Sequence, residues 1–190
     1  MGRKVYVHMT KLHDVKGRIR YISSSARQDN LYAVYETCER TFWWKLAREN
    51  QKDFCKSGTA GKCIEAREFI IALPENFTEY DSNELLREYT ELFKSTYGVE
   101  CISALHHNKA KTNYHIHLIF AERKLMDEPV RKIASRNMFY DEKGKHVRTK
   151  KDILDEQGEL RPGCKIIPKG EVHEEHLFEK KLAKFKEKNF

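Results

Sequence analysis

The chain has 190 residues, of which 34% are charged and 39% hydrophobic, and its formal net charge at pH 7 is +7. This length suits one domain with a full core and leaves little room for a second. No apolar stretch approaches the roughly 20 residues of a membrane span. The N-terminus shows no apolar signal segment, and the five cysteines lack CxxC spacing. These features argue against secretion, a disulfide framework or a zinc ribbon, so we expect a cytoplasmic protein.

The positive charge is clustered in two segments. Residues 1–27 hold seven Lys or Arg against one acid, and residues 123–151 hold ten against four, whereas residues 65–100 are rich in acids. Such clustering indicates a polyanionic partner, with nucleic acid as the first hypothesis. A merely solvated basic surface is the alternative.

The first half of the chain predicts strands and helices in alternation. Residues 4–12 alternate apolar and polar side chains and predict a strand, followed by a loop or short helix that contains Gly17. Residues 31–38 are β-prone, and 39–54 suit a helix with Phe42 and Trp43 in the core. Residues 64–74 predict a strand that ends at Pro74.

The middle of the chain predicts a helix and a hairpin. Residues 83–98 carry one apolar stripe, with Gly98 at the C-terminal cap. Residues 99–107 and 113–123 predict strands joined by a turn. The order strand, helix, strand, strand predicts an α+β fold, a central antiparallel sheet with helices packed on it. We assign residues 1–125 to this core, and 126–190 to a C-terminal extension with two Gly-centred hairpins and a basic helix over 174–189.

Histidines are concentrated in the hairpin. Side chains two apart on a strand share a face, so His115 and His117 lie about 6.6 Å apart and can converge on one divalent metal. A third histidine ends the preceding strand. His106 and His107 are both candidates, and their side chains should face opposite ways, so the choice needs the strand register. Two surface histidines without a metal are the alternative.

One carboxylate falls inside an apolar strand. Glu68 lies in the segment AREFIIALP, where a buried charge is costly unless it is paired. A histidine N–H or a bound metal is the expected partner. An edge-strand ion pair with Arg67 or Lys62 is the alternative.

Three segments together resemble a known family. REFIIALP (67–74), ALHHN (104–108) and NYHIHLIFAER (113–123), in that order, resemble the MobA/MobL family of plasmid mobilisation relaxases, which are HUH endonucleases. The resemblance covers roughly residues 1–125 and implies a ferredoxin- or RRM-like core. The family spacing favours His107 over His106, so it implies a divalent metal on His107, His115 and His117. Imidazole ligands fit Mn, Zn, Ni or Co at least as well as Mg, so these five ions are the candidates.

The resemblance also implies an activity. Family members cleave and rejoin single-stranded DNA at an origin of transfer, site- and strand-specifically, through a 5′-phosphotyrosine intermediate. Carried over to this sequence, the nucleophile is Tyr21, with Tyr32 and Tyr35 as fallbacks, and Glu68 acts near the metal or the tyrosine. The implied partners are single-stranded and hairpin DNA, relaxosome accessory proteins and a type IV secretion coupling protein, in a bacterial cytoplasm.

Basic and aromatic residues of the two clusters are the expected DNA contacts. They are Arg3, Lys4, Lys16, Arg18, Arg20, Arg27, Arg123, Lys124, Arg136 and Tyr140. Rival hypotheses are a rolling-circle initiator or HUH transposase that uses Tyr140, a non-catalytic DNA-binding module, and a metal hydrolase without DNA.

Overall fold

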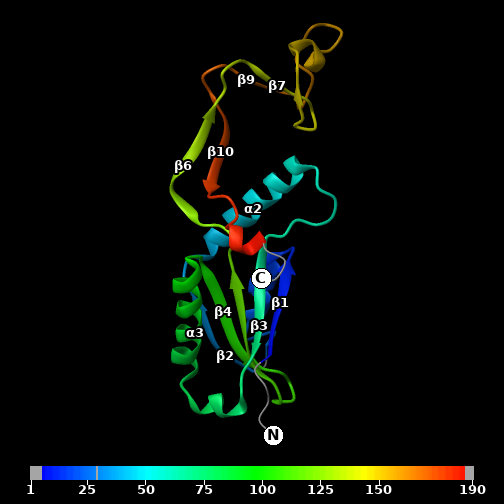
Figure 1. Ribbon diagram of the computed structural model, residues 1–190. Coiled ribbons are helices and arrows are strands. Elements are labelled where there is room, and N and C mark those ends of the chain that lie inside the picture. Colours follow the sequence, from blue (N-terminus) through cyan, green and yellow to red (C-terminus); the bar gives the residue numbers. More distant parts are fainter. Residues whose placement is uncertain (1–5, 29, 187–190) are drawn as a thin grey trace. The chain divides into compact units, whose positions relative to one another are not determined.

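The centre of the molecule is an antiparallel sheet. The computed structural model describes residues 6–28 and 30–186. Five strands pair in the order β1-β3-β5-β4-β2 (Figure 1). Their bounds are β1 Tyr6–Leu12, β2 Leu31–Glu36, β3 Ala66–Ala72, β4 Cys101–His107 and β5 Tyr114–Phe120. The predicted α+β class is confirmed.

Three α-helices accompany the sheet: α1 Val15–Ile22, α2 Arg40–Ser57 and α3 Ser82–Tyr97. The Asp14 side chain accepts a hydrogen bond from the Gly17 amide at 2.9 Å and starts α1, and Asp81 caps α3 in the same way. Helix α3 ends at Gly98, whose φ of 64° favours glycine. Polar caps therefore fix where α1 and α3 begin.

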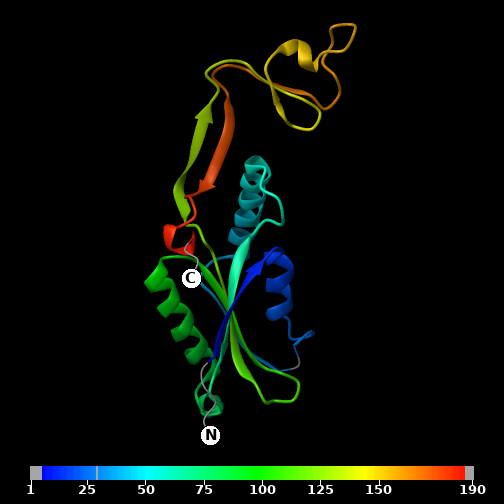
Figure 2. The ribbon, with the colours of Figure 1, turned by 45° about the vertical axis from the view of Figure 1, so that its right-hand side comes forward.

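Helices lie on both faces of the sheet. Figure 2 shows α3 and α1 on opposite sides of it. On the α3 side, the Phe69, Phe93 and Phe120 rings pack together with centroids 4.9–5.9 Å apart. Helices α1 and α2 bury Ile19 and Trp43, both 0% exposed. The sheet is thus a middle layer, with α3 on one face and α1 on the other.

Contacts divide the chain into two compact units, residues 1–125 with 178–190, and residues 126–177. In the second unit, β6 (Leu125–Ile133) pairs with β10 (Val172–Phe178). A small sheet joins β8 (His146–Val147), β7 (Met138–Tyr140) and β9 (Lys165–Ile167), and a 3₁₀ helix follows at Lys150–Ile153. Gly144 and Gly158 adopt positive φ in the two predicted turns. The division into a core (1–125) and an extension (126–190) stays a prediction.

The basic helix predicted over 174–189 is wrong for the residues that the structure describes. Val172–Phe178 is strand β10, and Ala183–Lys186 is a 3₁₀ helix. Pairing with β6 sets two cross-strand ion pairs, Arg131–Glu175 at 2.8 Å and Lys132–Glu174 at 2.9 Å. Pairing with residues more than forty positions away in the sequence therefore makes this segment a strand, although its local pattern favours a helix. In the described chain, no helix is both long and apolar enough to cross a membrane.

Candidate functional site

The register of the β4–β5 hairpin brings three histidines together. His106 lies directly opposite His115, and His117 lies opposite Ala104, so the three imidazoles share one face. Their ring centroids are 4.5–4.8 Å apart, and all three side chains are buried. Their ligand atoms lie within 4.8 Å of one another. Two predicted members of the cluster, His115 and His117, are therefore where a shared metal would need them.

The third member is His106. His107 points to the other face of the sheet, where its Nδ1 lies 3.0 Å from the Tyr32 hydroxyl and its Nε2 lies 3.2 Å from Glu75. The expected convergence of His107 with His115 and His117 is therefore wrong. The reason is strand alternation: with His106 opposite His115, the next residue must face away.

Hydrogen bonds determine which ring nitrogens are free. His115 Nδ1 lies 2.9 Å from the Asn113 carbonyl oxygen, and His117 Nδ1 lies 2.7 Å from a Glu68 carboxylate oxygen. Because both oxygens only accept, each Nδ1 carries the proton and each Nε2 of the neutral ring keeps its lone pair. The two Nε2 atoms face each other at 3.1 Å. Two lone pairs at this distance repel, and a shared cation would remove the repulsion.

His106 completes this donor set. Its Nε2 is buried and has no hydrogen-bond partner, a rare condition for a polar atom. Burial, followed by the neighbouring positive charges, lowers the pKa of His106 to about 3. Burial also lowers the pKa of His115, although its bond to Asn113 opposes the change. Neutral imidazoles are the form that binds divalent transition metals, so the cluster fits such an ion.

Glu68 supports His117 from the neighbouring strand β3. It is 1% exposed, and Arg18 Nε lies 3.0 Å from both of its carboxylate oxygens. Burial alone would raise the pKa of Glu68, but hydrogen bonds from His117 and Arg18 outweigh burial and lower it. The predicted histidine partner is therefore present. The cation that pairs with Glu68 is Arg18, and Arg67 pairs with Glu122 at 2.5 Å, so the alternative ion pair with Arg67 or Lys62 is not the one observed.

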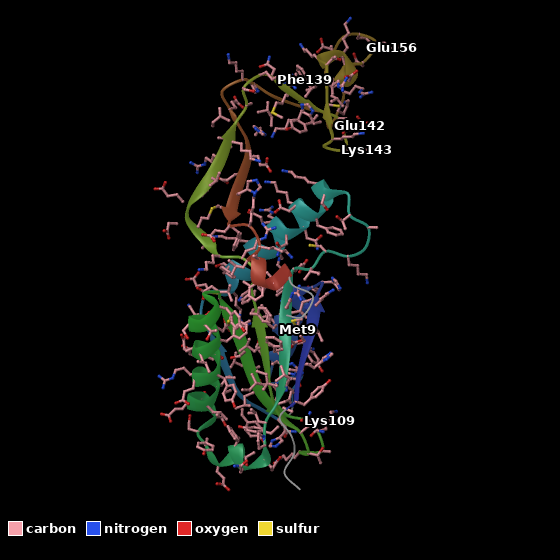
Figure 3. The ribbon with its side chains drawn as sticks, in the orientation of Figure 1. Met9, Lys109, Phe139, Glu142, Lys143 and Glu156 are labelled. Atoms are coloured by element: carbon pink, nitrogen blue, oxygen red, sulfur yellow. The ribbon has the colours of Figure 1, made fainter. Side chains whose placement is uncertain are left out.

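Tyr21 lies in the same hollow as the histidines. This hollow has a volume of about 330 Å³, and Tyr21, on the last turn of α1, is 44% exposed. The Arg18 guanidinium lies 5.4 Å from the centre of the Tyr21 ring. The hollow is lined by His106, His115, His117, Arg18, Tyr21, Arg27, Gln28, Asn30, Asn108 and Lys109. His107 also borders it, although the His107 ring contacts Tyr32 and Glu75 on the other face of the sheet. Figure 3 labels Lys109, which marks the turn between β4 and β5.

The fallback tyrosines have other neighbours. The Tyr32 hydroxyl contacts His107 on the opposite face of the sheet. The Tyr35 hydroxyl donates to Glu91 of α3 at 2.8 Å. Neither tyrosine lines the histidine hollow among the described residues, whereas Tyr21 does.

The predicted DNA contacts are dispersed. Arg27 lines the hollow, Arg20 is exposed on α1, and the Lys16 ammonium lies 5.2 Å from the Trp44 ring. Arg123 is 8% exposed and pairs with Asp53 at 2.7 Å, so its guanidinium is committed within the protein, against the prediction. Arg136 is exposed and Tyr140 half-buried in the second unit. Arg3 and Lys4 lie outside the described residues.

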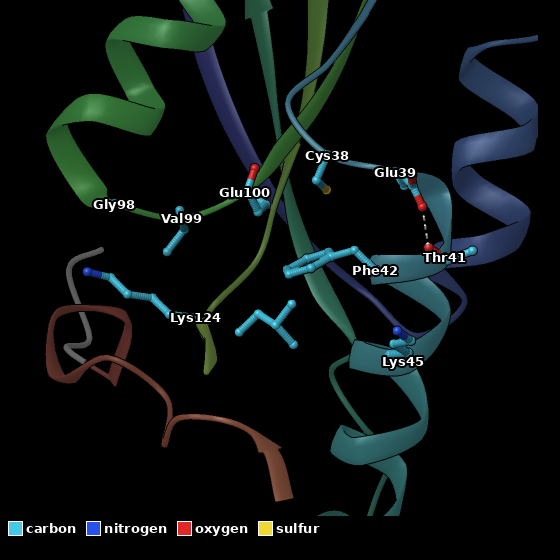
Figure 4. Close-up of a pocket in the computed structure, with 10 residues that line it drawn as sticks. Cys38, Glu39, Thr41, Phe42, Lys45, Gly98, Val99, Glu100 and Lys124 are labelled. Atoms are coloured by element: carbon cyan, nitrogen blue, oxygen red, sulfur yellow. Dashed lines mark hydrogen bonds between the residues drawn. The ribbon is translucent and has the colours of Figure 1, made fainter. Parts of the chain in front are cut away.

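A second hollow lies where β4 begins, at the end of that strand opposite His106. Figure 4 shows Phe42, Val99 and the Lys124 stem around it, and its volume is about 420 Å³. Its thiol, Cys38, is a poor nucleophile, because burial first, and then Glu100, raise its pKa to about 12. Lys124, predicted to contact DNA, borders this hollow instead of the histidine one.

Sequence reasoning missed what Arg18 does. It was predicted as a phosphate contact, but it bridges Glu68 and the Tyr21 ring, and its Nη2 lies 3.2 Å from His117 Nδ1. The available signal was the spacing of Arg18 and Tyr21, which are neighbours on one helical face. That signal needs residues 15–22 to be assigned as a helix, which the sequence left open.

Comparison with known proteins gives one family. The model of the MobA/MobL family, a relaxase family, matches residues 35–188, which is most of the chain. The matched span contains Glu68 and the three clustered histidines, and it begins after Tyr21. No curated protein matches the chain.

Proposed function

This chain belongs to the MobA/MobL family, and we propose on that premise that it cleaves and rejoins single-stranded DNA at an origin of transfer through a covalent bond to Tyr21. The observation that carries the proposal is a shared hollow: Tyr21 lines the same cavity as the three-histidine cluster. A nucleophile beside a metal-binding set is the arrangement that phosphoryl transfer requires.

The cluster is the proposed metal centre. His106, His115 and His117 would hold a divalent ion through their Nε2 atoms, with Mn, Mg, Zn, Ni and Co as candidates. Imidazole donors suit the transition metals better than Mg. When bound, such an ion polarises the scissile phosphate and stabilises the charge that develops on it. The cluster contains no carboxylate, so the three neutral rings would leave the ion its full positive charge.

Tyr21 is the proposed nucleophile. Its phenol oxygen would bond to the phosphorus while the bond to the 3′ oxygen breaks, leaving a 5′-phosphotyrosine and a free 3′-hydroxyl. The Arg18 guanidinium, 5.4 Å from the ring centre, packs against the Tyr21 ring and would hold it beside the cluster. The new phosphodiester bond keeps the energy of the old one, so the 3′-hydroxyl can attack it and rejoin the strand.

Glu68 has a positioning role in this proposal. It is buried, and its oxygens already accept bonds from His117 and Arg18. A carboxylate on the outer nitrogen of a metal-binding histidine fixes the tautomer and the ring orientation. The same carboxylate also holds the Arg18 guanidinium, which lies against the Tyr21 ring. Glu68 thereby ties the orientation of the histidine cluster to the position of the nucleophile.

The decisive experiment is adduct formation. The protein is incubated with Mn²⁺ and single-stranded oligonucleotides that tile the DNA flanking its gene, and a denaturant-resistant protein–DNA adduct is sought. We expect an adduct with wild type and with Tyr32→Phe, none with Tyr21→Phe, and none with chelator. An adduct that survives in Tyr21→Phe and disappears in Tyr140→Phe would support the rolling-circle or transposase alternative. Chelator-insensitive binding without any adduct would indicate a DNA-binding module.

A further inference from the structure

Strand β1 places two more ring side chains on the histidine face. In the register of β1 with β3, Tyr6 lies opposite Ala72 and His8 lies opposite Ile70. In the register of β3 with β5, the same Ala72 and Ile70 lie opposite His115 and His117. Directly paired residues point the same way, so Tyr6 and His8 share the face of the cluster. The Thr10–Glu68 contact of 3.4 Å, one step further along, agrees.

The two rings are open to solvent. Tyr6 is 62% exposed, and His8 is exposed as well. Their planes are within 8° of parallel, with centroids 6.3 Å apart. The side chains of Ile70 and Ala72, between β1 and the histidine strand, are only half-buried. At this edge, therefore, aromatic and aliphatic side chains of the sheet are open to solvent, and no helix of the described chain buries them.

This surface continues the histidine hollow. His8 and His117 are separated by two interstrand spacings, or about 10 Å. The hollow itself is bordered by cations, with Arg18 and Arg27 among its lining residues. A strand whose phosphate lies at the cluster can thus cross β3 and reach β1 within a short length of backbone.

We propose that Tyr6 and His8 form a nucleobase-stacking subsite for single-stranded DNA next to the scissile phosphate. The inference rests on the proposed function and adds where the substrate strand runs. Flat rings on an open sheet stack bases of any kind, whereas Arg27, which lines the hollow, can bind the phosphates. The subsite holds a base beside the cleaved bond and makes no contact with the reacting atoms.

Alanine substitutions test the subsite, and β1 supplies a matched control. Tyr6→Ala and His8→Ala should each weaken oligonucleotide binding about 10-fold or more, since stacking is worth about 1–3 kcal/mol per base. Tyr6→Phe keeps the ring and should bind like wild type. Val7→Ala is the control, because Val7 is 51% exposed on the same strand but faces the other side. Figure 3 labels Met9, which shares the side of Val7.

An abasic scan locates the base. An abasic site at the stacked position should weaken binding to wild type and to Val7→Ala, but should cost Tyr6→Ala little, because the contact is already lost. The Val7→Ala control should form the covalent adduct as wild type does.

The outcomes separate the two proposals. If wild type forms no adduct, the proposed function fails. If wild type forms the adduct while Tyr6→Ala and His8→Ala bind as tightly as Val7→Ala, or if no abasic position shows coupling to Tyr6, the stacking subsite is overturned and this face is left for another partner.

Discussion

The two faces of strands β4 and β5 bury very different chemistry. Toward α3 the strands present Leu118 and Phe120, and the Ser103 hydroxyl there bonds to Thr90 at 2.6 Å. Toward α1 they present imidazoles, and the buried Nε2 of His106 has no hydrogen-bond partner. Buried polar groups without partners destabilise a fold, so the apolar face supplies stability, whereas the histidine face, where we propose a metal site, lowers it.

The contrast is sharpest within one dipeptide. His106 and His107 are adjacent and both buried, yet His106 joins the cluster while His107 contacts Tyr32 and Glu75. Neighbouring residues with the same side chain therefore have separate roles because a strand alternates. A substitution on the apolar face should therefore change mainly the stability of the fold, and a substitution in the histidine cluster should change mainly metal binding.

The largest expected effect is on the apolar face. Phe120→Ala removes a ring that is 0% exposed and packs on Phe69, Phe93 and Phe185. It should lower the free energy of unfolding by about 3–5 kcal/mol, measured by urea denaturation. Leu92→Ala, at a position 68% exposed on α3, is the control and should have little effect. If Phe120→Ala also abolished metal binding in the folded protein, the two faces would not be separable.

The next effect distinguishes the two adjacent histidines. His106→Ala should weaken binding of Co²⁺ or Zn²⁺ by more than about 100-fold, since even an outer partner of a ligand is worth 10–100-fold. His107→Ala removes a ring from the opposite face and should leave the affinity nearly unchanged. Isothermal titration of both variants measures the difference. The reverse result would restore His107 as the ligand and refute the observed register.

The sequence predicted the strands of this site better than the register in which they pair. Period-two alternation identified His115 and His117 as one face, because alternation is a local property of a strand. Alternation could not choose between His106 and His107, since a slip of one residue in the strand pairing exchanges the two faces. The family resemblance favoured His107, and the register places His106 in the cluster.

Other differences also come from contacts between distant residues. The helical pattern over 174–189 gave way to β10, whose ion pairs reach Arg131 and Lys132. By contrast, α3 was predicted almost to the residue, because its apolar stripe and Gly98 are local signals. Arg18 lay between these cases: its charge was visible in the sequence, but its bond to Glu68, fifty residues away, was not.

A smaller effect concerns the support of the cluster. Glu68→Gln removes the charge that pairs with Arg18 and the preferred acceptor for His117 Nδ1. Metal affinity should fall about 10–100-fold, and adduct formation should fall with it. Glu91→Gln, at an exposed glutamate of α3, is the control. Arg18→Lys keeps a charge near Glu68 and should retain more activity than Arg18→Ala; equal loss in both variants would show that the planar guanidinium itself is required.

The smallest effect is a dependence of stability on pH that comes from the histidine face. Because the pKa of His106 is about 3 in the folded protein and about 6.5 in an unfolded chain, the unfolded state binds the extra proton between these values. The metal-free protein should therefore lose stability as pH falls below about 6.5, by at most about 1.4 kcal/mol per pH unit from this group. His106→Asn should flatten the slope between pH 6.5 and 5, while above pH 7 the stability difference between the two proteins should stay constant. Urea denaturation across this range measures both slopes, and parallel curves for wild type and His106→Asn would show that the imidazole of residue 106 is not held neutral by its burial.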